Sequence, residues 1–349
     1  MKHQAWGVSV LALSVLASPA MAQELNALVW CDHTDPELIR PFEEAHDVRV
    51  NLKVYEGTGA ALSIIEQSQP GDWDVLVIDG IDVPRAVDAG ILGPLPDEEM
   101  PLADIDETIR MDTQHRRDGV LYAVPEKYGY NTISFNNEAV PEAAMSDMSA
   151  LWSDDYAGEI AIYDYYLPVI GMVAMGLGKT TADLTVDDLP DIREVLFKLK
   201  DNSKLTGDVV ASQTALALGE VDILVGGGEW VTAGLSAENP ALDWVLPEQG
   251  GVRWSQSIGV FADSEQPELA QEFVKYILSP EGQARLATSS CYWAMPANTK
   301  AAEHLTASQK KALRWDEQPS YIANSQLYPA PDAALDAAMQ DLWTQMLQR

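Results

Sequence analysis

Residues 27–54 read ALVWCDHTDPELIRPFEEAHDVRVNLKV and contain the pattern from which the fold is predicted. The stretch opens with an apolar run that ends at Trp30. Asp35-Pro36 then supplies a helix N-cap and a first-turn proline, and apolar residues recur at helical spacing over 38–42. Over 48–54 apolar and polar residues alternate, which is typical of a strand. The chain is therefore predicted to open with a strand, a helix and a strand.

The same alternation of short strands and helices continues through the rest of the chain. The predicted elements are a strand over 74–79, a helix beginning at 83, a strand over 159–163, helices over 167–177 and 192–199, a strand over 221–225 and a helix over 269–277. Repeated units of this kind imply a parallel sheet covered by helices, with ligands bound beyond the carboxyl ends of the strands. Two sets of units, each of roughly 100 to 150 residues, predict an α/β protein with two lobes. Because no long Gly/Ser linker separates the sets, we expect strands that cross between the lobes to join them.

The charge of the chain restricts the classes of partner. Among 349 residues, 54 are Asp or Glu and 22 are Lys or Arg, which leaves a formal net charge of −32. This excess of acid argues against a nucleic-acid partner or an anionic membrane surface, because both need clustered Lys and Arg. Hydrophobic residues make up 47% of the chain and 10 Trp are present, so the chain is predicted to bury a core despite its charge.

The first 22 residues have the pattern of a secretory signal peptide. Lys2 is followed by an apolar run over 8–17 and by the small-x-small site Ala20-Met21-Ala22. The run is shorter than the roughly 20 apolar residues that a membrane-spanning helix needs. The sequence therefore predicts that residues 1–22 are removed after export and that the mature chain starts at Gln23.

Motifs of the common enzyme and cofactor sites are missing from the sequence. It contains no Gly-x-Ser-x-Gly elbow, no Walker-type phosphate loop and no His-Glu-x-x-His. Gly226-Gly227-Gly228 follows a predicted strand but lacks the dinucleotide-binding spacing, so we interpret it as a tight turn. We predict no catalytic residue and no cofactor, and we expect a protein that is not an enzyme.

Cys31, Asp32 and His33 combine three types of metal ligand directly after the first strand. Adjacent residues rarely point at one ion, and the sequence has no second Cys/His cluster, so no metal site is predicted from them. The two cysteines, Cys31 and Cys291, have two possible states that the sequence leaves open. They either form a disulfide, as an oxidising compartment allows, or remain buried free thiols.

Aromatic residues recur at the ends of the predicted strands, where a cleft between two lobes would be lined. They are Trp30, Tyr128, Tyr130, Tyr163, Tyr165, Tyr166, Trp230 and Trp254. The carboxylates in the same places are Asp32, Asp79, Asp82, Asp164 and Glu229. Aromatic faces attract cations, and a nearby carboxylate adds direct pairing. Core packing is the alternative role for any single ring, whereas the set predicts a site for a cationic head group.

Five segments resemble, in order and spacing, pieces of one family. Leu28-Val29-Trp30-Cys31-Asp32-His33 looks like a strand ending Trp-Thr-Glu-Tyr, and Val54-Tyr55-Glu56 resembles a Tyr-Glu pair after the second strand. Residues 73–77 are similar to Tyr-Asp-Leu-Val-Val, residues 128–132 to Trp-Gly-Ala-Thr, and residues 247–254 to Pro-Lys-Glu-Gly-Gly-Ile-Phe-Trp. The family is the periplasmic solute-binding proteins of ABC importers, specifically the spermidine/putrescine-binding branch. The resemblance covers nearly all of the mature chain.

The resemblance implies a fold, a location and a partner. The fold is the two-lobed periplasmic-binding-protein fold of type II, in which crossing strands act as the hinge and the ligand is enclosed between the lobes. The first lobe would hold residues 24–133 and 257–302, and the second would hold residues 134–256 and 303–349. The family also implies a periplasmic monomer that delivers its ligand to the membrane permease of an ABC importer.

The resemblance also assigns individual residues. Trp30 matches a cleft Trp, Asp32 an acidic position, His33 a cleft Tyr and Tyr128 a cleft Trp. Trp254 matches the Trp that stacks on the alkyl chain of a polyamine. By count from the C-terminus, Tyr328 falls where the family has a polar ligand contact.

Several positions depart from the polyamine-binding pattern. Gln256 stands where the family has an Asp that pairs with an amine. Tyr165 and Pro168 stand where it has two further carboxylates, with Asp164 one place earlier. The complete set of predicted ligand-binding residues is Trp30, Asp32, His33, Asp79, Tyr128, Asp164, Tyr165, Glu229, Trp230, Trp254, Gln256 and Tyr328.

These departures leave two ligand classes open. A primary ammonium needs acceptors around it, as a polyamine such as putrescine or spermidine would find at Asp32, Asp79 and Glu229. A methylated ammonium or a sulfonium has no N–H to donate and favours aromatic faces, which suits choline, betaine or a sulfonium osmolyte. A carboxylate on such a zwitterion would be received by His33, Arg253 or the backbone near residues 226–228. The alternative on the same fold is a protein that binds a metal ion, namely iron.

Overall fold

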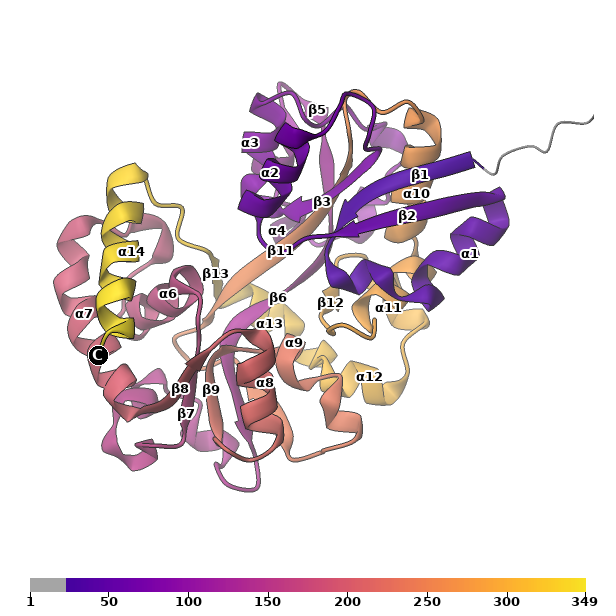
Figure 1. Ribbon diagram of the computed structural model, residues 1–349. Coiled ribbons are helices and arrows are strands. Elements are labelled where there is room, and N and C mark those ends of the chain that lie inside the picture. The colour runs from indigo at the N-terminus through magenta and orange to yellow at the C-terminus, as the bar shows by residue number, and fades with distance from the viewer. Residues whose placement is uncertain (1–22) are drawn as a thin grey trace, which may run out of the picture.

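The computed structural model describes residues 23–349, which form two lobes joined through the middle of a shared sheet (Figure 1). The predicted signal peptide, residues 1–22, lies outside the described residues. Among the described residues, no helix is both long enough and apolar enough to cross a membrane.

The chain alternates strands and helices along its length. The strands are β1 (Gln23–Val29), β2 (Val48–Val54), β3 (Val75–Asp79), β4 (Arg116–Arg117), β5 (Val120–Leu121), β6 (Ala123–Asn136), β7 (Ile160–Tyr163), β8 (Ser203–Gly207), β9 (Ile223–Gly227), β10 (Leu242–Val245), β11 (Gly251–Val260), β12 (Met295–Pro296) and β13 (Ser325–Leu327). The helices are α1 (Pro36–His46), α2 (Thr58–Gln67), α3 (Val83–Asp88), α4 (Glu107–Arg110), α5 (Asp112–His115), α6 (Tyr166–Gly176), α7 (Leu189–Asn202), α8 (Val209–Ala217), α9 (Glu229–Thr232), α10 (Pro267–Leu278), α11 (Pro280–Ala287), α12 (Ala307–Ala312), α13 (Gln318–Ala323) and α14 (Ala333–Leu347). Short 3-10 helices lie between them, and η1 (Cys31–Thr34) is the one that bears on the site.

The opening strand, helix and strand form as their sequence predicts. The side chain of Asp35 accepts a hydrogen bond from the Glu37 N–H at 3.0 Å and caps α1, with Pro36 in the first turn. Asp47 ends the helix in the left-handed conformation, at φ 51°. β2 then returns parallel to β1, with Val29 opposite Val54.

The sheet is mixed, although the repeated units predicted a parallel one. β1 pairs with β2 and β3 in parallel in one lobe, and β7 pairs with β8 and β9 in parallel in the other. Between these two groups, β11 runs antiparallel to both β3 and β6, and β6 runs antiparallel to β9. The parallel strands return through helices, whereas β6 and β11 cross from one lobe to the other without one, so they meet their neighbours antiparallel.

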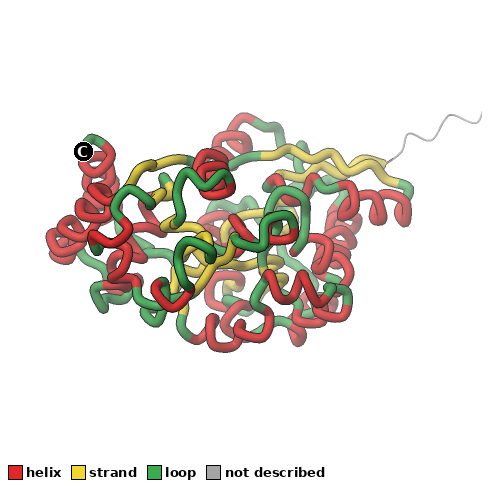
Figure 2. The backbone as a smooth tube through the Cα atoms, turned by 90° about the horizontal axis from the view of Figure 1, so that it is seen from below, coloured by secondary structure: helices red, strands yellow, loops and turns green. Residues whose placement is uncertain are grey.

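The strands β6 and β11 join the two lobes, as predicted. β6 pairs with β11 from Ala123 to Asn131 and then with β9 and β10 as far as Asn136. Both strands are buried along almost their whole length. Seen from below, most strands run through the interior and helices lie outside them (Figure 2). The predicted fold class, two α/β lobes with crossing strands, is confirmed.

Each lobe has its own hydrophobic core. One core gathers residues of β1, β3, α1, α10 and α11, and the other gathers residues of β7, α6, α7, β9 and α14. Leu305 and Leu313, which the predicted lobe boundaries assign to the second lobe, pack in the first core. The boundaries 24–133 with 257–302, and 134–256 with 303–349, stay a prediction.

Candidate functional site

One face of the central sheet carries a row of polar side chains. Gln256 in β11 lies opposite Asp79 in β3 and opposite Lys127 in β6. Residues directly opposite each other share a face of the sheet, so these three side chains project to one side. Two residues along, Trp254 lies opposite Gly129 on the same face. The crossing strands thus place Asp79, Gln256, Lys127 and Trp254 together.

Glu126 joins this face through an irregularity in β6. The pairing steps from Gln256–Lys127 to Ser257–Pro125, so Glu126 is the extra residue of a bulge. Its Oε1 accepts a hydrogen bond from Gln256 Nε2 at 2.9 Å, and its Oε2 lies 3.3 Å from His33 Nε2. The bulge therefore lets two successive residues of one strand contact the same cluster.

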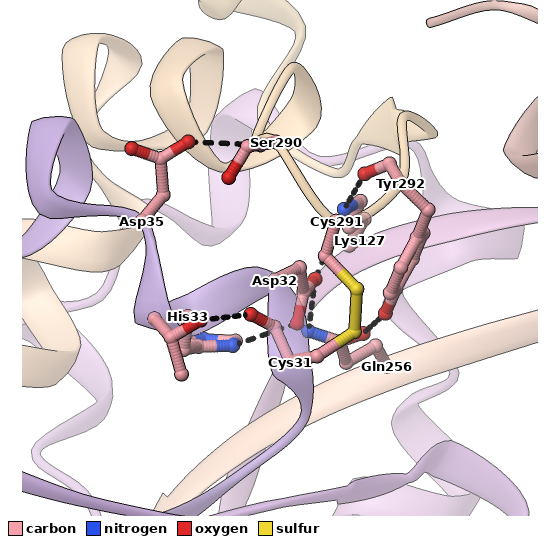
Figure 3. The surroundings of a disulfide bond; sticks show 10 residues. Cys31, Asp32, His33, Asp35, Lys127, Gln256, Ser290, Cys291 and Tyr292 are labelled. Atoms are coloured by element: carbon pink, nitrogen blue, oxygen red, sulfur yellow. Dashed lines mark hydrogen bonds and ion pairs between the residues drawn. A yellow bond between two sulfur atoms is a disulfide. The ribbon is translucent and has the colours of Figure 1, made fainter.

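Asp32 is at the centre of a buried ionic cluster (Figure 3). Its Oδ1 lies 3.0 Å from His33 Nδ1, and its Oδ2 accepts from Lys127 Nζ at 2.9 Å and from Gln256 Nε2 at 3.0 Å. Asp32, His33, Lys127 and Gln256 are all fully buried. Both oxygens of the carboxylate that matches the family's acidic position are thus already bound by the protein itself.

The charges in this cluster stabilise one another. Burial alone would raise the pKa of Asp32, but the positive charges of Lys127 and His33 hold it well below its usual range. Burial alone would lower the pKa of His33, but Glu126 and Asp32 raise it to about 10. His33 therefore carries a positive charge at neutral pH, and the cluster pairs two cations with two carboxylates.

A disulfide fixes the outer side of the cluster. Cys31 and Cys291 are joined across 260 residues of sequence, with their Cα atoms 5.9 Å apart. Of the two states that the sequence left open, the structure has the disulfide. Cys31 precedes Asp32 and Cys291 precedes Tyr292, so the bond holds these two residues on either side of Lys127 (Figure 3). The Ser290 N–H donates to Asp35 Oδ2 at 2.8 Å and ties the same two segments together.

Glu229 lies over Gly129 from the other lobe. Its Oε1 and Oε2 accept the Tyr130 N–H at 3.0 and 3.2 Å, and the side chain is fully buried. A Cβ atom on Gly129 would lie 1.6 Å from Glu229 Oε1 and 2.5 Å from Trp254 Cζ2, so only glycine fits. Burial raises the pKa of Glu229 to about 8, although the nearby charge of Lys127 opposes the shift.

Asp79 is the carboxylate of this face that lacks a protein partner. It ends β3 and is half-buried. Among the side chains that the structure describes, none donates a hydrogen bond to it or forms an ion pair with it. Burial raises the pKa of Asp79 to about 8, and the negative charge of Asp82 adds to this.

Tyrosines of the second lobe lie within electrostatic range of Asp79. Burial raises the pKa values of Tyr163, Tyr165 and Tyr328, and the charge of Asp79 raises each of them further. The rings contact one another: Tyr163 and Tyr165 have centroids 6.0 Å apart, as have Tyr165 and Tyr328. Trp230 adds a contact with Tyr163 at 5.3 Å. A carboxylate of the first lobe is thus within electrostatic range of a group of aromatic rings of the second.

Three further predicted residues, Trp254, Trp30 and Tyr328, each have different packing or hydrogen-bond partners. Trp254 packs against Tyr292 with ring centroids 6.1 Å apart, and Trp30 is half-buried in the first lobe against the cluster of Leu28 and Tyr55. Tyr328 donates to Asn131 Oδ1 at 2.7 Å.

The structure does not bring Tyr128 and Asp164 to the site. Tyr128 alternates with Lys127 and Gly129 along β6, so its ring projects from the opposite face and reaches Gln318 instead. Asp164 Oδ1 accepts from Trp343 Nε1 at 2.8 Å, which directs it towards α14.

Sequence reasoning missed Lys127, Glu126 and Tyr292. Two adjacent charged residues inside an otherwise uncharged stretch, 123–135, are the signal that would have marked Glu126 and Lys127 as buried partners of other charges. Tyr292 follows Cys291, and a firm assignment of the disulfide would have placed it beside Asp32.

Comparison with known proteins identifies relatives over most of the chain. Residues 37–314 match the family model described as bacterial extracellular solute-binding protein. The chain is 22% identical over 302 residues to the spermidine/putrescine-binding periplasmic protein of Escherichia coli, covering 82% of this chain and 83% of the relative. It is 21% identical to the putrescine-binding periplasmic protein PotF of the same organism, covering 97% of this chain and 95% of PotF. The crystal structure of PotD, a spermidine/putrescine ABC transporter substrate-binding protein from Streptococcus pneumoniae, has the same fold, with a TM-score of 0.79, 21% identity and coverage of 93% and 99%.

Proposed function

The chain belongs to the family of bacterial extracellular solute-binding proteins, which are transport proteins and not enzymes, and we propose that it captures a small organic cation between its two lobes. The bound cation is then delivered to the membrane permease of an ABC importer. Export through removal of residues 1–22 and residence in the periplasm as a monomer are part of the same proposal.

The observation that carries the proposal is the Asp79 carboxylate. It is half-buried, it lacks a partner among the described side chains, and its charge raises the pKa values of tyrosines in the other lobe. A carboxylate in such a place is costly unless a cation joins it. Aromatic faces with a carboxylate attract an organic cation more than they attract an anion or a neutral sugar.

Both ligand classes predicted from the sequence are compatible with this arrangement. The relatives named above, a spermidine/putrescine-binding protein and a putrescine-binding protein, favour polyamines such as putrescine and spermidine. The tyrosines within electrostatic range of Asp79 favour a methylated ammonium or a sulfonium, such as choline, betaine or a sulfonium osmolyte. Mass spectrometry of the solute released from purified protein, with a thermal-shift screen of both classes, separates them.

The iron-binding alternative has no observation in its favour. Cys31, the first member of the Cys31-Asp32-His33 triplet, is taken up in a disulfide, and Asp32 and His33 bind each other. Within residues 23–349, no group of three or more His, Cys, Asp or Glu side chains is placed to hold a metal ion.

Affinity for a cation should depend on pH through Asp79. Without ligand, burial raises the pKa of Asp79 to about 8. A cation binds the ionised form of Asp79, so below pH 8 the carboxyl group must first lose its proton. The affinity for choline should therefore rise about tenfold per pH unit from pH 6 to pH 8 and then level off. Choline does not titrate in this range, so calorimetry at pH 6, 7, 8 and 9 reports on the protein alone. An affinity that stays constant from pH 6 to pH 9 would mean that the cation does not pair with a carboxylate that titrates in this range.

Trp254→Ala should weaken binding of the cation at least tenfold, or about 1.4 kcal/mol. Trp254 is nearly buried on the same face as Asp79, against Tyr292. Calorimetry of the folded variant measures the change. Trp73→Ala is the matched control, because Trp73 is a half-buried indole of the first lobe whose N–H donates to Ser68 Oγ at 2.7 Å. Equal affinities for Trp254→Ala and the unmodified protein would remove Trp254 from the site.

A further inference from the structure

Lys127 is a fully buried cation in the middle of a crossing strand. Its Nζ donates to Asp32 Oδ2 at 2.9 Å and to the Tyr292 carbonyl oxygen at 3.0 Å. The same nitrogen lies 3.9 Å from the centre of the Tyr292 ring. The ammonium thus has a carboxylate, a carbonyl oxygen and an aromatic face around it.

These three groups are the ones that a binding protein offers to the amine of a ligand. Here a side chain of the protein occupies them. Neither oxygen of Asp32 is free for a second amine, because Oδ1 contacts His33 and Oδ2 also accepts from Gln256. Tyr292 is held in turn by a hydrogen bond from its hydroxyl to Gln256 Oε1 at 2.6 Å.

The ammonium of Lys127 and the open carboxylate lie in one row of the sheet. Asp79 and Lys127 face Gln256 from its two sides, across neighbouring strands. Strands are spaced about 4.8 Å apart, so the two positions are separated by roughly 10 Å. A ligand with two cationic ends would need an available carboxylate at both positions. At the second position, both oxygens of Asp32 are already bound by His33, Lys127 and Gln256.

We propose that Lys127 takes the place of one amine of the ligand, so that this protein selects small cations with a single cationic centre over diamines and longer polyamines. This inference rests on the proposed function, in that Asp79 holds the cation. Lys127 acts as a specificity-determining residue, because its charge occupies the second acidic position.

The unmodified protein gives the first test. Calorimetry at pH 8 compares choline and propylamine, each with one cationic centre, with butane-1,4-diamine. We expect the better of the two monocations to bind at least tenfold more tightly than the diamine. Tighter binding of the diamine overturns the inference and leaves the proposed function standing. Failure of every cation to bind overturns the proposed function as well.

Lys127→Ala gives the second test. Truncation at Cβ removes three methylenes and the ammonium, which together have the size of propylamine, and leaves Asp32 Oδ2 without the ammonium that it binds. Propylamine should therefore raise the melting temperature of Lys127→Ala at least twice as much as that of the unmodified protein. The affinity of the variant for butane-1,4-diamine should rise at least tenfold.

The double variant Asp32→Asn with Lys127→Ala is the matched control. It has the same space but lacks the carboxylate, so we expect propylamine to raise its melting temperature no more than that of the unmodified protein. An equal rise in the single and the double variant overturns the inference. If Lys127→Ala does not fold, the comparison of the monocations with butane-1,4-diamine on the unmodified protein still tests the inference.

Discussion

Asp79→Asn is expected to lower the affinity for the bound cation about 100-fold, or about 2.8 kcal/mol. The substitution keeps the shape of the side chain and removes the charge that the cation would pair with. Truncating one partner of a desolvated charge pair typically costs this much or more. Calorimetry at pH 8 with choline, and with butane-1,4-diamine, measures the loss.

The stability of the ligand-free protein should change in the opposite direction. The folded protein raises the pKa of Asp79 from 3.8 to about 8, so the carboxylate destabilises the fold as pH rises above 3.8. Asn carries no charge at any pH, and Asp79→Asn should melt at the same or a higher temperature at pH 8. Loss of binding together with unimpaired stability would identify a residue retained for its ligand.

Asp164→Asn is the matched control for Asp79→Asn. Asp164 is exposed and accepts from Trp343, and Asn retains an oxygen for that bond. Its affinity for the cation should equal that of the unmodified protein. If Asp164→Asn loses binding and Asp79→Asn keeps it, the site lies nearer to α14 than we propose.

Gly129→Ala should destabilise the protein by about 3 kcal/mol and abolish measurable cation binding. The added Cβ would lie 1.6 Å from Glu229 Oε1 and 2.5 Å from Trp254 Cζ2, and both side chains are buried and packed. Overpacking of this kind costs roughly 1–3 kcal/mol, and the depth of the overlap places Gly129→Ala at the upper end. Moving Glu229 would also break its bonds to the Tyr130 N–H.

Chemical denaturation and calorimetry test this expectation. Gly59→Ala is the control, because a Cβ at Gly59 meets nothing within 4 Å and α2 gains a better helix former. We expect Gly59→Ala to be neutral or slightly stabilising and to bind normally. Comparable stabilities for Gly129→Ala and Gly59→Ala would mean that Glu229 and Trp254 are not held over Gly129.

Local patterns were enough to predict most of the fold. Period-two alternation over 48–54 and the cap at Asp35 are signals within a few residues, and β2 and α1 form there. The direction of the crossing strands is not a local property. β6 and β11 pair residues more than 100 positions apart, such as Tyr128 with Ser255, so their antiparallel order was not predicted.

The site residues divide in the same way, into those marked by a local sequence signal and those whose partners are distant in sequence. Asp79 and Glu229 were predicted because they follow strands, where side chains gather at the end of a sheet. Asp32 was predicted to be a ligand carboxylate, and its binding to Lys127 could not be predicted because Lys127 is 95 residues away in sequence. Tyr128 was assigned by resemblance, and strand alternation places it on the other face.

Calorimetric titration of ligand-free protein at pH 8 with choline, propylamine and butane-1,4-diamine tests the binding proposal most directly. We expect at least one of these cations to bind with a Kd in the micromolar range or below. In a second titration at pH 7, binding should release protons from the protein, because Asp79 must ionise to pair with the cation. Absence of heat with every cation, together with binding of a neutral or anionic solute, would contradict it.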